Sequence, residues 1–572
     1  MLKGIATSSG IAIGKVYKLE QPKIIIKEHR DEIKANPEQE IDRFDNALLK
    51  TIKDIEKIKE RASATLKAEE LAIFDAHLMM AQDPEFKDQI INMIREGVSA
   101  DKATKTVSDT MIGMFESMDD SYFKERAADI KDVSYRLLCN ILGLTIPDLT
   151  TINEEVVIVA EEMTPSDTAQ LNKKYALGFV TEIGGKTSHA AIMAVALGLP
   201  AVVGCTGIMA EAKHGDTIIL DAKEGTVILN PDEATLKEYE EKRQKFLEEK
   251  AALQVLLNKP SISVDGHQVE LVANIGSPKD MDNVVANGAE GVGLYRTEFL
   301  YMESTDDFPS EDAQFEAYKV VLERAQGKRV VVRTLDIGGD KKLPYFEFDP
   351  EMNPFLGYRA IRLCLDRKDI FKTQVRALLR ASTYGKLAIM FPMIATVDEF
   401  KAAKQFVLDT KEELKSEGVE VADQIEIGMM VEIPASAVLA DQFAKYADFF
   451  SIGTNDLIQY SMAADRMSEK VAYLYQPLNP SILRLVKMTI DGAHSQGRWC
   501  GMCGEMGGDP MAAPVLLGLG LDEFSMSASR ILPTRKIITS LNKKEMEELA
   551  NKALQCHTEG EVVDLVKEVL KA

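Results

Sequence analysis

Eight short apolar segments recur between residues 261 and 572, and most of them are followed by a stretch with helical periodicity. We interpret each segment as a strand, because it is short, apolar and bounded by turn residues. Eight strands that alternate with helices predict a (β/α)8 barrel, with its functional residues at the carboxyl ends of the strands. The predicted strands are 270–275, 291–296, 329–336, 387–393, 426–433, 449–453, 499–504 and 523–527.

The amino-terminal part of the chain has a different pattern. Residues 1–20 are typical of a strand or hairpin, residues 37–143 carry apolar side chains at spacings of three and four, and strand-like runs return between 155 and 230. This order predicts a helical bundle inserted into an α/β unit whose sheet residues 1–20 complete. Residues 232–257 are polar on nearly every side, as in a helix that joins domains through solvent. We therefore expect an α/β domain of residues 1–30 and 144–231, a helical domain of 31–143, a helical linker of 232–260 and the barrel of 261–572.

Charge and cysteine content argue against several classes of function. A formal net charge of −23 opposes binding to nucleic acid or to an anionic membrane. The amino-terminus has no apolar signal segment, and the apolar run 190–205 is broken by Gly198 and Pro200, so a buried helix and strand are expected there. Six scattered cysteines do not make a disulfide framework, which favours a reducing cytoplasm.

His189 lies where a glycine turn becomes a helix. The glycine pair 184–185 ends an apolar strand, and Thr187 or Ser188 is a suitable N-cap for the strongly helix-forming segment 190–197. In the first turn of that helix, unpaired backbone N–H groups and the positive end of the helix dipole disfavour an imidazolium and suit a phosphate on the ring. The sequence therefore predicts a histidine that carries a phosphoryl group.

Two other interpretations of this segment are open. Residues 185–187 imitate the end of a nucleotide-binding loop of the Walker A type, but the required first glycine falls at Val180, which makes this alternative the weaker one. A histidine near a helix start is also often a capping or core residue without chemistry.

Charged and polar side chains gather at the predicted carboxyl ends of the barrel strands. Arginines that converge on one end of a barrel repel one another unless an anion lies among them. The hydrogen-bond donors of a guanidinium fit the oxygens of phosphate and of carboxylate alike. Glu432 and Asp456 supply oxygen ligands from neighbouring strands, and two carboxylates completed by substrate phosphate and water are a usual Mg²⁺ arrangement. The alternative is that these residues form structural salt bridges. It loses support as more of them are found at the same, carboxyl end of the strands. The residues are Arg296, Glu298, Arg333, Asp336, Glu432, Asn455, Asp456, Arg466, Cys503 and Glu505.

Cys500 and Cys503 form a C-x-x-C pair, a spacing found in zinc and redox sites. The chain has no second C-x-x-C and no H-x₃₋₅-H partner, which argues against a structural zinc site. On a strand, side chains three residues apart face opposite sides. A thiol with an ordinary pKa of about 8.5 stays protonated at neutral pH, so Cys503 can act as an acid toward a carbanion-like carbon.

Four long motifs carry a resemblance to a known family. GGKTSHAAIMA, GVGLYRTEFLYM, SIGTNDLIQYSMAADR and CGEMGGDP resemble Enzyme I of the bacterial sugar phosphotransferase system, the phosphoenolpyruvate–protein phosphotransferases, and the similarity covers the whole chain. The resemblance implies phosphoryl transfer from phosphoenolpyruvate to a histidine and onward to the phosphocarrier protein HPr, with release of pyruvate. It also implies Mg²⁺ as cofactor and a homodimer joined through the barrel domain.

The resemblance further implies roles for single residues. His189 would be the phosphorylated nucleophile, Thr168 would orient its ring, and Cys503 would protonate the methylene carbon of the leaving enolate. Glu432 and Asp456 would bind Mg²⁺. The residues expected to bind substrate are Arg296, Arg333, Arg359, Asn455, Asp456 and Arg466.

The expected dock for HPr is an acidic, methionine-containing surface on the helical bundle. An exposed apolar spot with a carboxylate rim suits a small partner that has basic residues around an apolar spot. The alternative is that the methionines complete bundle packing beside a solvated acidic edge. The residues expected to bind HPr are Glu69, Glu70, Met79, Met80 and Glu85.

Two rival functions follow from the same motifs. Pyruvate phosphate dikinase and phosphoenolpyruvate synthase share the histidine segment and the barrel, but they need a large ATP-binding domain, for which residues 31–143 are too few and too poor in glycine-rich strands. A non-catalytic phospho-signalling adaptor would lack some of the barrel residues named above, and all are present. The sequence therefore favours the phosphotransferase.

Overall fold

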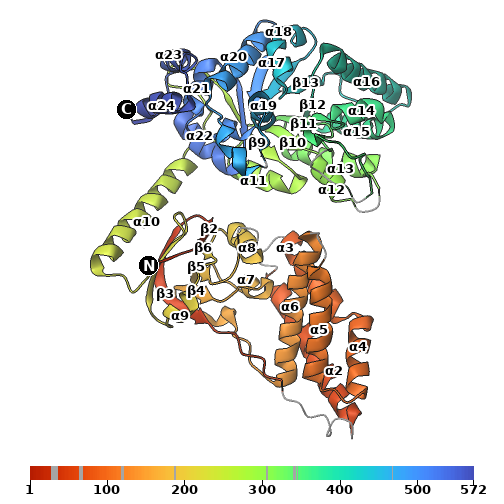
Figure 1. The fold of residues 1–572 in the computed structure, drawn as a ribbon, viewed down its shortest axis with the longest axis vertical. Helices are drawn as coiled ribbons and strands as arrows, with labels where there is room; N and C mark the ends of the chain where they lie inside the picture. The colour runs from red at the N-terminus through yellow and green to blue at the C-terminus, as the bar shows by residue number, and fades with distance from the viewer. Residues whose placement is uncertain are drawn as a thin grey trace. The chain divides into compact units, whose positions relative to one another are not determined.

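The structure is a computed structural model that describes residues 1–26, 36–62, 68–117, 121–185, 188–304, 307–338, 343, 345–466 and 468–571. Only the backbone is described at positions 61, 62, 68–72, 121–126, 128, 165, 169, 189, 192, 195, 196, 469 and 571. The chain divides into two compact units, Met1–Glu249 and Lys250–Ala572 (Figure 1). The predicted boundaries of the smaller domains within these units stay predictions.

The first unit contains an eight-stranded sheet with the order β1-β8-β7-β3-β4-β5-β6-β2. Its strand β3 pairs in parallel with β4 and antiparallel with β7, so the amino-terminal residues lie inside the sheet, as predicted. The strands are β1 (Leu2–Lys3), β2 (Ile5–Ser8), β3 (Ile11–Leu19), β4 (Val156–Ala160), β5 (Ala176–Thr181), β6 (Ala201–Val203), β7 (Thr217–Asp221) and β8 (Thr226–Leu229).

The helical bundle lies between β3 and β4 in the chain, and its long helices run side by side in Figure 1. Phe44 and Val133 of the bundle belong to the same buried cluster as Ile158 and Phe179 of the sheet. The bundle and one face of the sheet therefore share a continuous apolar core. The bundle helices are α2 (Pro37–Ala62), α3 (Ala68–Ala81), α4 (Pro84–Arg95), α5 (Ala100–Glu116) and α6 (Ser121–Leu142), and those that follow are α7 (Pro165–Ala169), α8 (His189–Leu197), α9 (Ile208–Glu211) and α10 (Glu233–Gln254).

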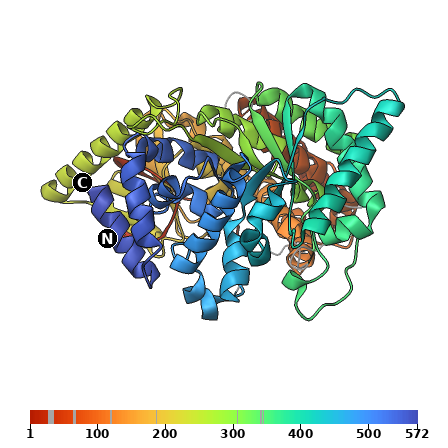
Figure 2. The same cartoon turned by 90° about the horizontal axis from the view of Figure 1, so that it is seen from above.

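The second unit is a closed barrel of eight parallel strands, which confirms the predicted fold class. All eight predicted strands are present, each within a few residues of its expected bounds. Figure 2 shows the helices of this unit around its strands. The strands are β9 (Glu270–Ile275), β10 (Val292–Arg296), β11 (Arg329–Arg333), β12 (Lys386–Phe391), β13 (Glu426–Val431), β14 (Phe449–Ile452), β15 (Trp499–Met502) and β16 (Glu523–Met526).

Helices connect the barrel strands. The helices of the second unit are α11 (Met281–Ala286), α12 (Glu298–Met302), α13 (Glu311–Arg324), α14 (Ile361–Asp366), α15 (Lys368–Ala381), α16 (Val397–Ser416), α17 (Pro434–Val438), α18 (Ala440–Phe443), α19 (Thr454–Met462), α20 (Pro480–His494), α21 (Ala513–Leu519), α22 (Ile531–Ile538), α23 (Lys543–Ala553) and α24 (Glu559–Lys571). Short 3₁₀ turns include η6 (Glu505–Gly508) and η7 (Ala528–Arg530). Of the described residues, no helix is long and apolar enough to cross a lipid bilayer.

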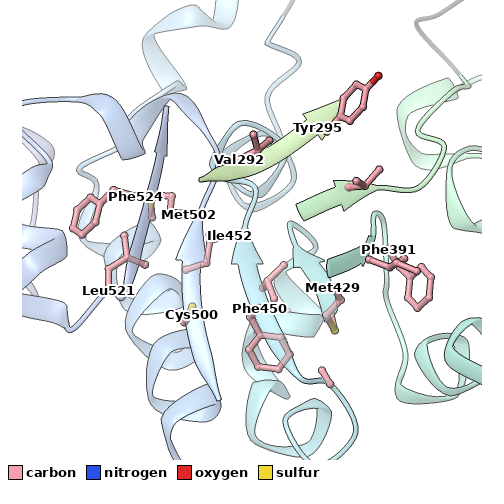
Figure 3. Packing of buried hydrophobic residues seen from close by; sticks show 14 of the residues in the cluster. Val292, Tyr295, Phe391, Met429, Phe450, Ile452, Cys500, Met502, Leu521 and Phe524 are labelled. Atoms are coloured by element: carbon pink, nitrogen blue, oxygen red, sulfur yellow. The ribbon is translucent and has the colours of Figure 1, made fainter. Parts of the chain in front are cut away.

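The apolar side chains of the barrel form two separate layers, because successive residues of a strand point to opposite faces. An inner cluster fills the barrel; its members are Leu294, Val331, Ala388, Met390, Met430, Phe449 and Cys503. The residues of opposite parity form an outer layer against the helices, part of which Figure 3 shows; it includes Val292, Phe391, Met429, Phe450, Ile452, Cys500, Met502 and Phe524. This alternation decides which polar side chains can reach the barrel mouth.

Each buried apolar cluster draws its described residues from one unit alone. Helix α10, which contains the boundary between the units, buries only Tyr239. A fragment of residues 1–258 should therefore fold by itself, with one cooperative melting transition in the range of about 45–65 °C that is usual for such domains. Circular dichroism during heating measures this, and a fragment without a cooperative transition would place the fold boundary elsewhere.

Candidate active site

Four of the predicted side chains share the inward-facing parity of the barrel strands. Arg296, Arg333 and Glu432 lie two positions after inner-cluster residues of β10, β11 and β13, and Cys503 belongs to that cluster itself. Because side chains alternate along a strand, the four face the barrel axis at its carboxyl end. Arg333, Glu432 and Cys503 are buried, and Arg296 is half-buried.

Asp336 joins two buried arginines in this mouth. Its Oδ2 lies 2.9 Å from Arg333 Nη1, and its Oδ1 accepts a hydrogen bond of 2.8 Å from Arg359 Nη2. Arg333 Nη2 also donates to Glu298 Oε1 at 2.6 Å. The Nε atoms of Arg333 and Arg359 are buried and have no hydrogen-bond partner among the described residues. An unpaired buried donor costs about 1–3 kcal/mol, so these two N–H groups suit an anionic ligand.

Gly338 allows Arg359 to approach Asp336. The backbone of Gly338 has a φ of 137°, and a Cβ there would lie 2.4 Å from Arg359 Cβ. A larger residue at this position would therefore displace the arginine from the carboxylate that holds it.

Glu432 and Asp456 are two buried carboxylates at this end of the barrel. Burial, together with the negative charges of Asp456 and Asp336, raises the pKa of Glu432 to about 8. Asp456 Oδ1 is buried and accepts no hydrogen bond from the described residues, and Arg466 Nη1 lies 3.7 Å from it. Among the residues that the structure describes, no group of three or more His, Cys, Asp or Glu side chains could hold a metal ion. Two carboxylates by themselves would leave the other ligands of a cation such as Mg²⁺ to substrate and water.

Asn455 and Arg466 lie beside this pair, on and after helix α19. Asn455 Oδ1 accepts a hydrogen bond of 2.8 Å from the hydroxyl of Tyr475, and the backbone N–H of Arg466 donates to Gln459 Oε1 at 3.0 Å. Asn455 is in the first turn of α19 together with Asp456, so one helix start carries an amide and a carboxylate to the same mouth.

A cavity of about 570 Å³ opens beside Arg296. Its walls come from the carboxyl ends of β9, β10 and β16, from the segments that follow β15 and β16, and from residues 475–477 before α20. The polar lining residues that bear on its chemistry are Asn274, Arg296, Tyr475, Glu505, Asp509 and Arg530. The predicted arginine thus lines an open cavity that carries several polar side chains.

Cys503 and Cys500 face opposite sides of the barrel wall, as predicted. Cys500 belongs to the outer layer (Figure 3), whereas Cys503 belongs to the inner cluster. Burial raises the pKa of the Cys503 thiol to about 11, and Glu432 adds to this, while Ser451, Arg333 and Arg296 oppose it. The thiol is therefore protonated at neutral pH, which suits a proton donor rather than a nucleophile.

The first unit holds the predicted histidine. Helix α8 begins at His189, and Ser188 caps it, because Ser188 Oγ accepts a hydrogen bond of 3.4 Å from the N–H of Ala191. The side chain of His189, and Thr187, lie outside the described part of the structure. Thr168 is fully buried in α7, and its hydroxyl donates to Thr164 O at 3.1 Å.

The methionine-containing surface of the bundle is smaller than expected. Met79 exposes 66% of its surface, whereas Met80 packs partly against the bundle core. Glu85 is exposed in the first turn of α4, and the side chains of Glu69 and Glu70 lie outside the described part of the structure. Among the described side chains of α3, Met79 is the apolar one that is most exposed.

Comparison with known proteins matches most of the chain to families of phosphoenolpyruvate-utilising enzymes. The amino-terminal domain of these enzymes matches residues 3–126, their mobile domain matches 152–225, and their phosphoenolpyruvate-binding domain matches 250–543. A phosphoenolpyruvate-protein phosphotransferase of Staphylococcus carnosus is 57% identical over 571 residues, which cover 100% of this chain and 99% of the relative. The enzyme of the same name from Bacillus subtilis is 56% identical, with 100% of both chains covered.

The chain belongs to the phosphoenolpyruvate-protein phosphotransferase family. It is an enzyme that transfers the phosphoryl group of phosphoenolpyruvate to protein, so the phosphotransferase function predicted from the sequence is confirmed. Similarity over the full length to enzymes of this name does not favour a dikinase or a phosphoenolpyruvate synthase.

Sequence reasoning missed several residues of the mouth of this phosphotransferase. Asn274 and Arg530 line the cavity beside Arg296, and Tyr475 contacts Asn455, but none of the three was predicted. Asn274 could have been found, because it is a polar residue of inward parity near the end of the first barrel strand. Arg530 lies in a turn after the last strand and carried no comparable signal.

Proposed function

We propose that His189 accepts the phosphoryl group of phosphoenolpyruvate bound at the barrel mouth and passes it to the phosphocarrier protein HPr. One observation carries this proposal most: buried arginines with unpaired donors, a carboxylate pair and a protonated thiol meet at one end of the barrel. Phosphoryl transfer needs mainly positioning and charge neutralisation, and this set of groups can supply both.

The arginines hold the two anionic ends of the substrate. Arg333 and Arg359, fixed by Asp336, present planar donors that match phosphate and carboxylate oxygens. Arg296 adds positive charge in the open cavity, and Arg466 adds it beside Asp456. Fixed donors of this kind stabilise the charge that spreads over the phosphoryl oxygens during transfer. Asn455 contributes an amide that contacts substrate.

Glu432 and Asp456 bind Mg²⁺. Arg333, Arg359 and Arg466 bring positive charge to this pair, yet Asp456 Oδ1 accepts no hydrogen bond from the described residues, so the two carboxylates would hold a divalent cation together with oxygens of substrate and water. Held there, Mg²⁺ would neutralise negative charge on the substrate and help to orient it.

Cys503 completes the reaction as the acid. Loss of the phosphoryl group leaves the enolate of pyruvate, whose electron pair is shared between its oxygen and its methylene carbon. That carbon forms a C–H bond as the S–H bond of Cys503 breaks, so pyruvate leaves and a thiolate remains. The thiolate then takes a proton from water. Its pKa of about 11 returns it to the thiol at neutral pH.

His189 and the barrel residues belong to different units, so each cycle requires the units to approach and to separate. Helix α10 is the hinge for this movement, because it buries only Tyr239 and can tilt without opening a core. Thr168 orients the imidazole for attack. The enzyme acts in the cytoplasm as a homodimer joined through the barrel unit.

The reaction itself gives a direct test. The purified chain mixed with phosphoenolpyruvate and Mg²⁺ should form acid-labile phosphate on protein and release an equal amount of pyruvate. Replacement of phosphoenolpyruvate by ATP should give neither product. ATP-dependent labelling would instead support the dikinase alternative.

HPr docks on the bundle around Met79. Reversal of Glu69, Glu70 and Glu85 to lysine should weaken HPr binding by about 3- to 150-fold and flatten its salt dependence, since the loss of three rim charges at about 0.2–1 kcal/mol each amounts to about 0.6–3 kcal/mol. Titration calorimetry at two salt concentrations measures both effects. Labelling of the variant by phosphoenolpyruvate should stay normal, because the reacting groups are elsewhere.

A matched triple reversal controls for the change in net charge. Glu154, Glu155 and Glu224 are exposed in the α/β part of the same unit, and their reversal to lysine should leave HPr affinity within about twofold. Equal weakening by both triple variants would show a general charge effect and move the dock away from α3 and α4.

A further inference from the structure

Asn274 of β9 and Ser525 of β16 form a hydrogen-bonded pair next to Cys503. Ser525 Oγ donates to Asn274 Oδ1 at 2.5 Å, and Asn274 Nδ2 donates to the carbonyl oxygen of Cys503 at 3.0 Å. Ser525 is fully buried, and Gly293 gives it space, because a Cβ at Gly293 would lie 2.4 Å from Ser525 Oγ. Three strands thus place one amide against the cysteine backbone.

The backbone of Cys503 is held from both sides by these contacts. Its N–H donates to Ile452 O at 3.1 Å, and its carbonyl receives the Asn274 amide. Strand pairing of β15 with both of its neighbours ends at Met502, so Cys503 lies one residue beyond the ladder. A side chain therefore supplies the hydrogen bond that the next strand does not.

The direction of the Asn274 amide follows from its partners. A serine hydroxyl can donate to the amide oxygen, and a carbonyl can only accept from the amide nitrogen. With both contacts made, the nitrogen side of Asn274 faces Cys503, and a change at Ser525 would release this orientation.

We propose that Asn274, held by Ser525, is a positioning residue that fixes the Cys503 thiol over the methylene carbon of the enolate. The proposal rests on the role of Cys503 as proton donor proposed above. In the step that it supports, the S–H bond breaks, the proton and the enolate electron pair form the C–H bond, and the thiolate recovers a proton from water. A displacement of about 1 Å can slow such a step by about 100-fold.

A substrate-binding role for Asn274 is the alternative, since it lines a cavity together with Arg296. The two roles have different kinetic consequences. Loss of a substrate contact raises KM, whereas loss of thiol positioning lowers kcat with KM nearly unchanged. Loss of positioning also allows the enolate to leave and take its proton from water on either face.

The test uses Asn274→Leu, which keeps the branched shape without adding charge, and Ser525→Ala in the full chain. Phosphoenolpyruvate with deuterium at one methylene position is converted in tritiated water, and the pyruvate is trapped at once as lactate for analysis of its methyl configuration. We expect kcat for pyruvate formation to fall about 10- to 100-fold in Asn274→Leu and less in Ser525→Ala. We expect both variants to form pyruvate whose methyl group has lost its defined configuration, while the KM for phosphoenolpyruvate stays within about twofold of that of the parent enzyme.

Two further variants make the outcomes separable. Ser382→Ala removes another buried serine hydroxyl, which contacts Leu379 O and the N–H of Ala422 at the opposite end of the strands. Pyruvate made by this control variant should keep its full methyl configuration.

Pyruvate made by Cys503→Ala should lose its methyl configuration. If it does not, the proton donor is another group and the positioning proposal is overturned with it. If Cys503→Ala loses configuration while folded Asn274→Leu keeps it, only the positioning proposal is overturned. Should Asn274→Leu not fold, retained configuration in Ser525→Ala overturns it.

Discussion

Replacement of His189 by alanine should abolish the phosphoprotein completely. The ring nitrogen is the proposed acceptor, and alanine has no side-chain nitrogen that can form a phosphoramidate. Incubation with labelled phosphoenolpyruvate and Mg²⁺, followed by separation at alkaline pH, where phosphohistidine survives, measures the label on protein. Binding of phosphoenolpyruvate, followed by calorimetry, should stay within about twofold, because the barrel mouth belongs to the other unit.

His214 provides the matched control for this variant. It is an exposed histidine of the same unit that packs edge-on against Tyr17, with 5.3 Å between ring centroids. His214→Ala should be labelled at the parent rate. If the label persists in His189→Ala and disappears in His214→Ala, then His189 is not the residue that carries the phosphoryl group, and our proposal is wrong.

Replacement of Cys503 by alanine should slow pyruvate formation by roughly 10²–10⁴-fold, the usual contribution of a positioned general acid. The arginine network and the carboxylate pair should remain, because their recorded hydrogen bonds and ion pairs involve other residues. The KM for phosphoenolpyruvate should therefore change little. A coupled assay with lactate dehydrogenase follows pyruvate directly.

Cys500→Ala is the control for Cys503→Ala. The two thiols lie on one short segment and are both buried, but Cys500 belongs to the outer layer of the barrel. Its loss should leave turnover close to that of the parent enzyme. Normal turnover in Cys503→Ala would transfer the acid role to another group, and Glu505, exposed at the start of η6 and lining the cavity, is the next candidate.

Both sites place a reactive group at the end of a regular element whose backbone is otherwise paired. His189 begins α8, and Cys503 lies one residue beyond β15. At such positions, side chains take over the hydrogen bonds that the regular pattern no longer makes: Ser188 at the helix and Asn274 at the strand. Ser188 and Asn274 thus hold the backbone next to a reactive side chain in place.

Periodicity predicted most of the fold. Apolar runs of four to eight residues gave all eight barrel strands and the amino-terminal strand β3, because a buried strand needs side chains that are apolar on both faces. Spacings of three and four gave the bundle helices, and the absence of an apolar stripe gave the exposed helix α10. These signals are local, so the sequence alone carries them.

Packing against distant residues decided what local patterns left open. Met79 and Met80 are neighbours with the same chemistry, yet only Met79 is exposed, because the fold turns the other toward the bundle core. The bundle and the sheet also share one core, to which Phe44 and Phe179 contribute from segments far apart in the chain.

The sequence by itself determined the family and the barrel and predicted charged residues at the barrel mouth, because long motifs and the pattern of apolar strand residues can be recognised without knowledge of their neighbours. Only the tertiary structure showed that Asp336 bridges Arg333 and Arg359, and that Asn274 holds Cys503 from a strand more than two hundred residues earlier. A hydrogen bond depends on the separation and direction of two atoms, and residues remote in sequence acquire both only when the barrel closes.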